Sequence, residues 1–138
     1  MVTKRPAGYR ELEHTADWEL EAWAPNLTGL FVQSARGMMD LSGVCLEAGA
    51  REERSLMLEA PDAESLLVKF LSELLFLSEA ENLAFDEFDI SIKENKLDGR
   101  IRGAPLARLD KEIKAVTYHN LSIQKTSRGL EVRLVFDV

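Results

Sequence analysis

The sequence is poor in cysteine and histidine. Cys45 is the single cysteine, so the chain cannot form an internal disulfide, which suits a reducing cytoplasm. We expect Cys45 to be a small buried apolar side chain. With two histidines, the chain has too few ligands for a typical structural zinc site. The eight glycines are scattered and none precedes Lys-Ser or Lys-Thr, which argues against a phosphate-binding loop.

Long hydrophobic runs are also missing. No apolar stretch approaches the roughly 20 residues needed to cross a bilayer. The N-terminus, MVTKRPAGYR, has basic residues without an apolar region behind them, so we expect no secretory signal. A hydrophobic content of 46% with 30% charged residues is typical of a globular protein. We therefore expect a single cytoplasmic domain, residues 1–138, with residues 1–8 flexible and no membrane partner.

Positive charge is in the minority. Seventeen basic residues stand against 24 acidic ones, which gives a formal charge of −7. Binding to a phosphate backbone depends on Lys and Arg, so this chain is a poor candidate for holding nucleic acid by itself. It is better suited to a cation or to a basic protein partner.

The first half of the sequence predicts two strands and a helix. Tyr9 to Glu13 is expected to be a short strand, and residues 18–22 alternate apolar and acidic side chains as a half-buried strand does. APNLTGLFVQSARGMMDLSG predicts a helix with Asn26 as its N-cap and Gly43 as a left-handed C-cap. Its apolar stripe consists of Leu27, Leu30, Phe31, Ala35, Met38 and Met39.

The second half predicts one more strand, a long helix and a series of hairpins. Residues 51–59 are expected to form a strand, and residues 61–80 a helix capped by Asp62 whose broad apolar face lies across a sheet. A partner helix in a groove is the alternative for that face. The later strands are expected at 85–92, 97–103, 112–125 and 130–138, with turns at 93–96 and 126–129 and a link at 104–111.

This order of elements, ββαβαββββ, indicates the α+β class. We expect a mainly antiparallel sheet with the two helices packed on one face.

The segment LEHTADWELEAW places His14, Thr15 and Asp17 in the connection between the first two expected strands. Turn chemistry alone would explain Thr15 and Asp17, since both side chains bond backbone groups readily. His14 would then be a partly exposed histidine. An isolated HTxD pattern does not decide between a turn and a site.

Asp137 is the penultimate residue, which brings its carboxylate beside the terminal carboxylate of Val138. Clustered anionic oxygens are unfavourable unless a positive charge lies among them. A hard cation such as Ca²⁺ or Mg²⁺ prefers oxygen ligands of this kind. If Asp17 lies beside Asp137 across the sheet, three anionic groups converge; otherwise the terminal carboxylate lies in water.

The segment EIKAVTYHNL is the third candidate. As a strand it would carry Ile113, Ala115, Thr117, Leu121 and Ile123 on one face and Lys114, Val116, Tyr118 and Asn120 on the other. His119 falls on the more apolar face, where we expect a hydrogen-bonded core histidine. Lys114 and Tyr118 are either plain sheet-surface residues or contacts for a partner or an anionic phosphate.

Taken in order, LEHTAD, LLVKFLSELLFL, EIKAVTYHNL and VFDV resemble the archease family over nearly the whole chain from Tyr9. The resemblance implies a small α+β protein that is not itself an enzyme and that activates an RtcB-class RNA ligase. Such a ligase seals tRNA halves and other RNAs with GTP and manganese. The activator promotes guanylylation and repeated turnover of the ligase, and would meet RNA only indirectly through it.

The resemblance also implies a metal site, usually assigned to calcium, with Mg²⁺ as the alternative. Asp17 of HTAD, Asp137 and the C-terminal Val138 match the ligands of the family. Lys114 matches the lysine of the family's KAVTY motif and is a functional candidate. His14 and Tyr118 are further candidates for contact with the partner.

Two features depart from the family pattern. Trp18 and Glu19 follow HTAD, where the family has an aliphatic residue and then often glycine, so Glu19 either adds charge near the site or faces water. The link at 104–111 is shorter than usual and lacks a histidine commonly found there, so engagement of the ligase by this segment is expected to differ.

Two other functions compete with the ligase activator. The first is a metal-dependent phosphoryl hydrolase, in which Asp17 and Asp137 hold the ion and His14 is the general base. The second is a chaperone or scaffold that uses its helix and sheet surfaces without a metal.

Overall fold

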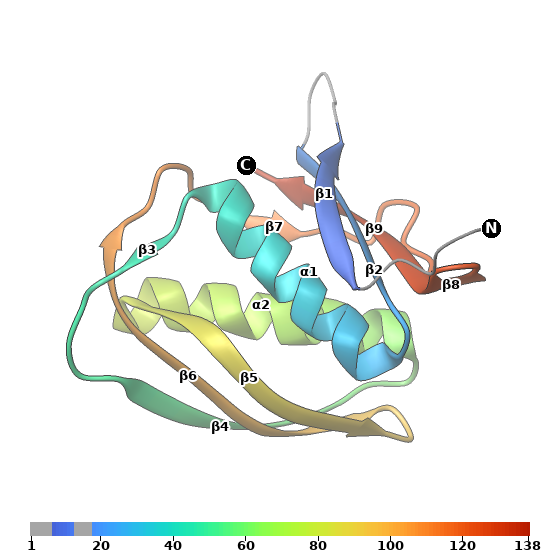
Figure 1. Cartoon of the computed structure of the whole chain (residues 1–138), viewed down its shortest axis with the longest axis horizontal. Coiled ribbons are helices and arrows are strands. Elements are labelled where there is room, and N and C mark those ends of the chain that lie inside the picture. Colours follow the sequence, from blue (N-terminus) through green and yellow to red (C-terminus); the bar gives the residue numbers. More distant parts are fainter. Residues whose placement is uncertain (1–6, 13–17) are drawn as a thin grey trace.

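Two helices and two antiparallel sheets make up the structure, a computed structural model that describes residues 7–12 and 18–138 (Figure 1). Helix α1 spans Leu27–Ser42 and α2 spans Ala63–Glu81. Both helices contact strands of both sheets, so the core lies between helices and sheets. This confirms the predicted α+β class, with the strands divided between two sheets. Within the described residues, neither helix has both the length and the apolar character needed to cross a membrane.

The first sheet contains the ends of the described chain. Its strand order is β1 (Gly8–Leu12), β2 (Trp18–Ala24), β9 (Gly129–Asp137) and β7 (Ala115–Val116). The short β8 (Gln124–Thr126) also pairs with β9. β7 and β8 therefore lie along the same edge of β9, at its two ends.

The second sheet is built around a long central strand. β6 (Lys96–Arg108) pairs with β4 (Glu52–Glu59), with β5 (Leu83–Lys93) and with the short β3 (Cys45–Leu46). The β5–β6 hairpin turns at Glu94 and Asn95, which both have positive φ, where residues 93–96 predict a turn. Toward the opposite end of the β5–β6 pairing, position 103 requires glycine, because a Cβ there would lie 1.7 Å from the carbonyl oxygen of Ala84.

The helix ends follow the predicted capping residues. The side chain of Asn26 accepts a hydrogen bond from the N–H of Gly29 at 2.8 Å, and Asp62 accepts one from Ser65 at 2.7 Å. Gly43 takes the left-handed conformation expected of a C-cap, with φ of 69°. These local signals fix where each helix begins and where α1 ends.

Phe70 of α2 joins three elements in the core. Its ring stacks on Phe31 of α1 at a centroid distance of 5.7 Å and meets the edge of Phe88 of β5 at 6.1 Å. The same core cluster includes the buried side chains of Leu20, Leu30, Leu66, Leu67, Leu71, Leu97, Ile101, Leu134 and Phe136. The predicted role of α2 as the main core element is therefore confirmed.

The predicted strand at 112–125 is wrong in its middle. The chain leaves β9 after β7 and returns only at β8, because a turn forms in which the N–H of Leu121 bonds the carbonyl of Tyr118 and Asn120 has a φ of 52°. The alternation of faces fails with it: Ala115 is exposed and Val116 is buried. His119 is exposed in this turn, so the expectation of a core histidine is also wrong.

Three smaller expectations are corrected as well. The predicted link at 104–111 is largely strand, since β6 continues to Arg108. Cys45 is exposed, because it lies on the short edge strand β3. Gly8, expected within the flexible N-terminal segment, is the first residue of β1.

Candidate functional site

The end of β9 is held in place by the segment that precedes and forms β7. The backbone N–H of Lys114 donates to the carbonyl oxygen of Asp137 at 2.8 Å, and the N–H of Thr117 donates to that of Val135 at 3.0 Å. Between these bonds, Ala115 lies opposite Asp137 in the ladder. The last residues of β9 thus have a neighbour on this edge.

The start of β2 lies on the other edge of the same strand end. Trp18 pairs with Phe136, which is the residue before Asp137. His14 and Asp17, two of the predicted site residues, lie outside the described residues. The residue that follows Asp17 in sequence is therefore directly opposite the residue that precedes Asp137.

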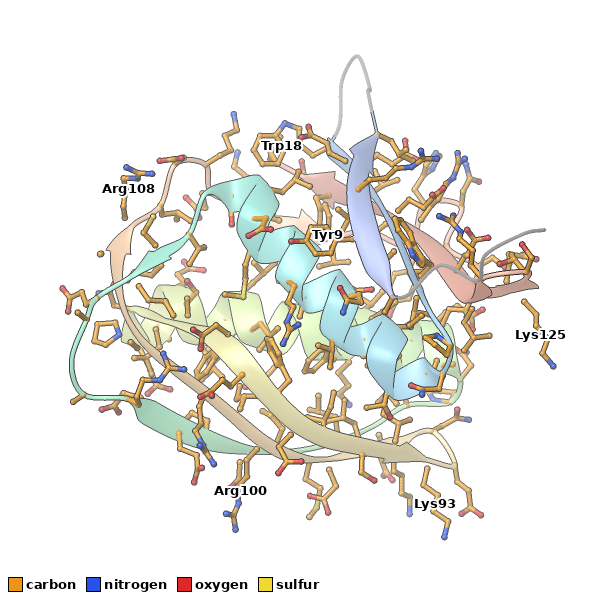
Figure 2. The ribbon with its side chains drawn as sticks, viewed as in Figure 1. Tyr9, Trp18, Lys93, Arg100, Arg108 and Lys125 are labelled. Carbon is orange, nitrogen blue, oxygen red and sulfur yellow. The ribbon has the colours of Figure 1, made fainter. Side chains whose placement is uncertain are left out.

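The link between β6 and β7 reaches the same end of the sheet. Its residues Asp110 and Lys111 donate backbone hydrogen bonds to the carbonyl of Ser42 at the end of α1, at 3.0 and 3.1 Å. The ammonium group of Lys111 lies 5.9 Å from the centre of the Trp18 ring. Figure 2 shows Trp18 close to this end of α1.

The predicted site residues that the structure describes face solvent here. Asp137, Lys114 and Tyr118 are all exposed, Tyr118 to 61%, while Val138 is half-buried against the core. Carboxylate oxygens are ligands that Ca²⁺ and Mg²⁺ accept, so the side chain of Asp137 has suitable chemistry for either ion. Within residues 7–12 and 18–138, no three Asp, Glu, His or Cys side chains gather closely enough to hold a metal.

Glu19, one of the departures from the family pattern, points to the outer face of the first sheet. Its side chain is 15% exposed and lies 4.0 Å from the guanidinium of Arg133. The contact places Glu19 beside a cation on the sheet, so Glu19 does not simply face water, whereas its addition of charge near the metal site stays a prediction.

A second charged cluster lies on this outer face and was missed from sequence. Glu21 was expected on the water-facing side of the strand, yet it is only 7% exposed. Its carboxylate accepts hydrogen bonds from Arg128 at 2.8 Å and Arg10 at 3.1 Å, and Arg133 lies 3.8 Å away. Arg128 also covers the ring of Trp23, with 4.2 Å between its guanidinium and the ring centre.

The electrostatics of this cluster favour the ionised form of Glu21. Burial alone would raise the pKa of Glu21, but the hydrogen bond from Arg128 and the charges of Arg10, Arg128 and Arg133 together hold that pKa below its usual value. The cluster joins β1, β2 and the β8–β9 hairpin, so its role is structural. Sequence alternation alone gave no sign of it, because the hairpin arginine is remote in sequence.

Tyr9 makes a comparable link between β1 and α1. Its hydroxyl donates a hydrogen bond to Asp40, and Figure 2 shows the side chain lying over α1. Burial, the hydrogen bond to Asp40 and the charge of Asp40 raise the pKa of Tyr9 to about 12. Tyr9 therefore stays protonated and acts as a hydrogen-bond donor.

The sequence of this chain matches the Archease protein family over residues 9–138. The chain belongs to the archease family. It is 34% identical to the protein archease of Methanosarcina barkeri over 139 aligned residues, which covers 94% of this chain and 95% of that protein. It is 30% identical to the protein archease of Archaeoglobus fulgidus, with 94% of this chain and 98% of that protein covered.

Solved structures show the same archease fold. An archease from Thermotoga maritima, called a possible chaperone, has a TM-score of 0.69 at 22% identity and covers 100% of this chain and 99% of its own. A solution structure of a protein from Methanobacterium thermoautotrophicum has a TM-score of 0.68 at 23% identity, covering 95% and 99%. Membership of the archease family supports an accessory role.

Proposed function

We propose that this chain is a cytoplasmic, non-enzymatic activator of an RtcB-class RNA ligase. It promotes guanylylation and repeated turnover of the ligase, and it meets RNA only through the ligase. A hard cation, Ca²⁺ or Mg²⁺, is held at the end of the first sheet by Asp17, Asp137 and the carboxylate of Val138. The observation that carries the proposal is the position of Asp137, whose side chain is exposed. Its backbone carbonyl accepts a hydrogen bond from the amide of Lys114, and the residue before it, Phe136, pairs with Trp18.

The register of the first sheet supports the ligand set. Trp18 lies opposite Phe136, and these residues adjoin Asp17 and Asp137 in sequence. Two carboxylates brought together at such a strand end would repel each other, and a cation between them removes that repulsion. When bound, the cation supplies a fixed positive charge that accepts oxygen ligands from the partner or its nucleotide.

Lys114 and Tyr118 contact the ligase in this proposal, together with His14. Lys114 and Tyr118 are exposed, and Lys114 makes no ion pair with any residue that the structure describes, so its charge is available for a partner. A lysine is well suited to an anionic phosphate because its ammonium group has three donors on a long stem. The exposed His119 adds a polar side chain next to Tyr118.

Transfer of labelled GMP to the ligase tests the proposed function. A cognate RtcB-class ligase is incubated with manganese and radiolabelled GTP, with or without a substoichiometric amount of this chain. We expect the fraction of ligase that carries covalent GMP to rise faster with the chain present, and Asp137→Asn to abolish the gain. Asp89→Asn is the matched control, since Asp89 is an exposed aspartate on the other sheet, and it should act as wild type.

Equal rates of guanylylation with and without the chain would contradict the proposal. The same samples without ligase address the competing hydrolase: metal-dependent release of phosphate from nucleotides by the chain alone would favour it. Suppression of the aggregation of unrelated proteins, unchanged by Asp137→Asn, would favour the chaperone instead.

A further inference from the structure

An apolar groove of about 720 Å³ lies between α2 and the segment that leads from β6 to β7. The C-terminal half of α2 forms one wall. Residues 106–109 and 112–116 form the other, and the end of α1 contributes Met38, Met39 and Val44. Figure 2 labels Arg108, which lies on this segment at the end of β6. The groove is thus framed by elements from distant parts of the sequence.

The side chains that line the groove are unusual for a solvent-facing surface. Phe76 of α2 is 59% exposed and Leu109 is 41% exposed, and both belong to the groove. Exposed aromatic and aliphatic side chains around a concave apolar surface are typical of a site that a partner covers. A polar small molecule suits the groove less well, because no described residue has a buried side-chain polar atom that lacks a hydrogen-bond partner.

The rim of the groove is charged. Glu79, Glu112 and Lys114 line it and form no ion pair with any described residue, whereas Arg108 is paired with Asp110 at 3.1 Å. The chain as a whole carries −7. A protein that holds RNA phosphates presents Lys and Arg on its surface. The two unpaired glutamates and the net charge of the chain are therefore complementary to basic residues on the surface of an RNA-binding protein.

The groove continues into the candidate site. Lys114 lines it, and the amide of the same residue bonds Asp137. Ala115, also in the lining, lies opposite Asp137 in the ladder. A partner that covers the groove therefore lies next to the end of β9.

We propose that this groove docks the ligase by receiving an apolar side chain that is flanked by basic residues on the ligase surface. The inference rests on the proposed function and adds the docking contact that brings Asp137 and Lys114 to the ligase. Phe76 and Leu109 become buried on binding. Glu79 and Glu112 meet the basic residues around the inserted side chain.

Binding of the purified chain to the ligase by calorimetry or biolayer interferometry tests this surface. Phe76→Glu and Leu109→Glu are each expected to weaken the Kd by about tenfold or more, since each places a charge in a contact that becomes desolvated. Phe76→Leu, which keeps an apolar side chain, should restore most of the affinity. Met57→Glu is the matched control, because Met57 is 83% exposed on β4 and lies outside the groove.

Two further readouts make the result specific. Calcium affinity should be the same in Phe76→Glu as in wild type, which separates docking from the cation site. The double variant Glu79→Lys, Glu112→Lys should associate with the ligase more slowly, and its association rate should depend less on salt concentration than that of wild type. Thermal unfolding identifies any variant that has lost the fold, and Phe76 is exposed enough for Phe76→Glu to retain it.

The outcomes distinguish the groove from the proposed function. If wild type binds and activates the ligase while Phe76→Glu and Leu109→Glu bind equally well, the docking surface is wrong and the function stands. If wild type neither binds nor activates the ligase, both are wrong. A dimer in sedimentation that Phe76→Glu converts to a monomer would show a second copy as the occupant and would also overturn the docking proposal.

Discussion

The backbone amide of Lys114 donates a hydrogen bond to the carbonyl oxygen of Asp137 at 2.8 Å, which joins the KAVTY segment to the C-terminal end of β9. The bond uses backbone atoms, so both side chains remain exposed at the same end of the sheet. A carboxylate for a cation and an ammonium group for an anion are thus presented together.

Asp137→Asn should weaken calcium binding without unfolding the protein. Loss of a charged ligand is expected to lower the affinity by at least about tenfold, whereas the exposed position of Asp137 predicts little change in stability. Calorimetric titration of Ca²⁺ and of Mg²⁺ measures this, with Asp89→Asn as the control. Equal affinities for wild type and Asp137→Asn would rule Asp137 out as a ligand.

Lys114→Ala should impair ligase activation while leaving stability within about 0.5 kcal/mol of wild type, because the side chain is exposed. Lys125→Ala is the matched control, since Lys125 is an exposed lysine on β8 at the other end of β9 (Figure 2). Guanylylation rates and melting temperatures are measured on the same samples. Full activation by Lys114→Ala would remove the lysine from the partner surface.

The Glu21 cluster should make stability fall in acid. The pKa of Glu21 is lower in the folded protein than its ordinary value of 4.5, so the folded state favours the ionised carboxylate. Its contribution is therefore fully present above pH 4.5 and is lost as the pH falls through the lower, folded-state pKa.

Glu21→Gln is accordingly expected to cost about 2 kcal/mol at pH 7, because it removes hydrogen bonds between charged partners. The difference from wild type should shrink as the pH falls below 4.5. Urea unfolding between pH 7 and pH 3 measures both effects. Glu53→Gln, which breaks the exposed pair with Arg102, should cost less than about 1 kcal/mol, and a pH-independent deficit in Glu21→Gln would contradict the account.

Phe70→Ala should destabilise the protein by about 3–5 kcal/mol, since it opens a cavity at the junction of α1, α2 and β5. Phe70→Leu leaves a smaller cavity and is expected to cost less. Chemical denaturation followed by circular dichroism gives both values. If Phe70→Ala were as mild as Phe70→Leu, the volume of the side chain at this junction would contribute little to stability, which would contradict the prediction.

Helix ends were predictable from sequence because their signals are local. Asn26 and Asp62 each bond an N–H three residues ahead, and Gly43 needs only its own left-handed φ. Residues 112–125 were harder, because whether they pair with β9 depends on contacts made far along the chain. A turn at Asn120 competes with the ladder there, and it moves His119 into solvent.

The surroundings of the candidate site depended on tertiary packing in the same way. Alternation predicted that Glu21 faces water, yet Arg128, 107 residues later in the sequence, donates a hydrogen bond to Glu21 and also covers the ring of Trp23. The groove beside Phe76 forms only when residues 106–116 pack near α2, which no local pattern shows. Asp137 and Lys114 were found from motifs and prove to be neighbours, whereas the meeting of Asp17 with Asp137 stays a prediction.

The number of ligated RNA molecules produced per ligase molecule tests the central claim most directly. Cleaved RNA, GTP and manganese are supplied in excess, and the chain is added well below the concentration of the ligase. The account predicts that product exceeds one molecule per ligase with wild type and with Asp89→Asn, and stays at or below one with Asp137→Asn or without the chain. Repeated turnover that is equal in all four reactions would contradict it.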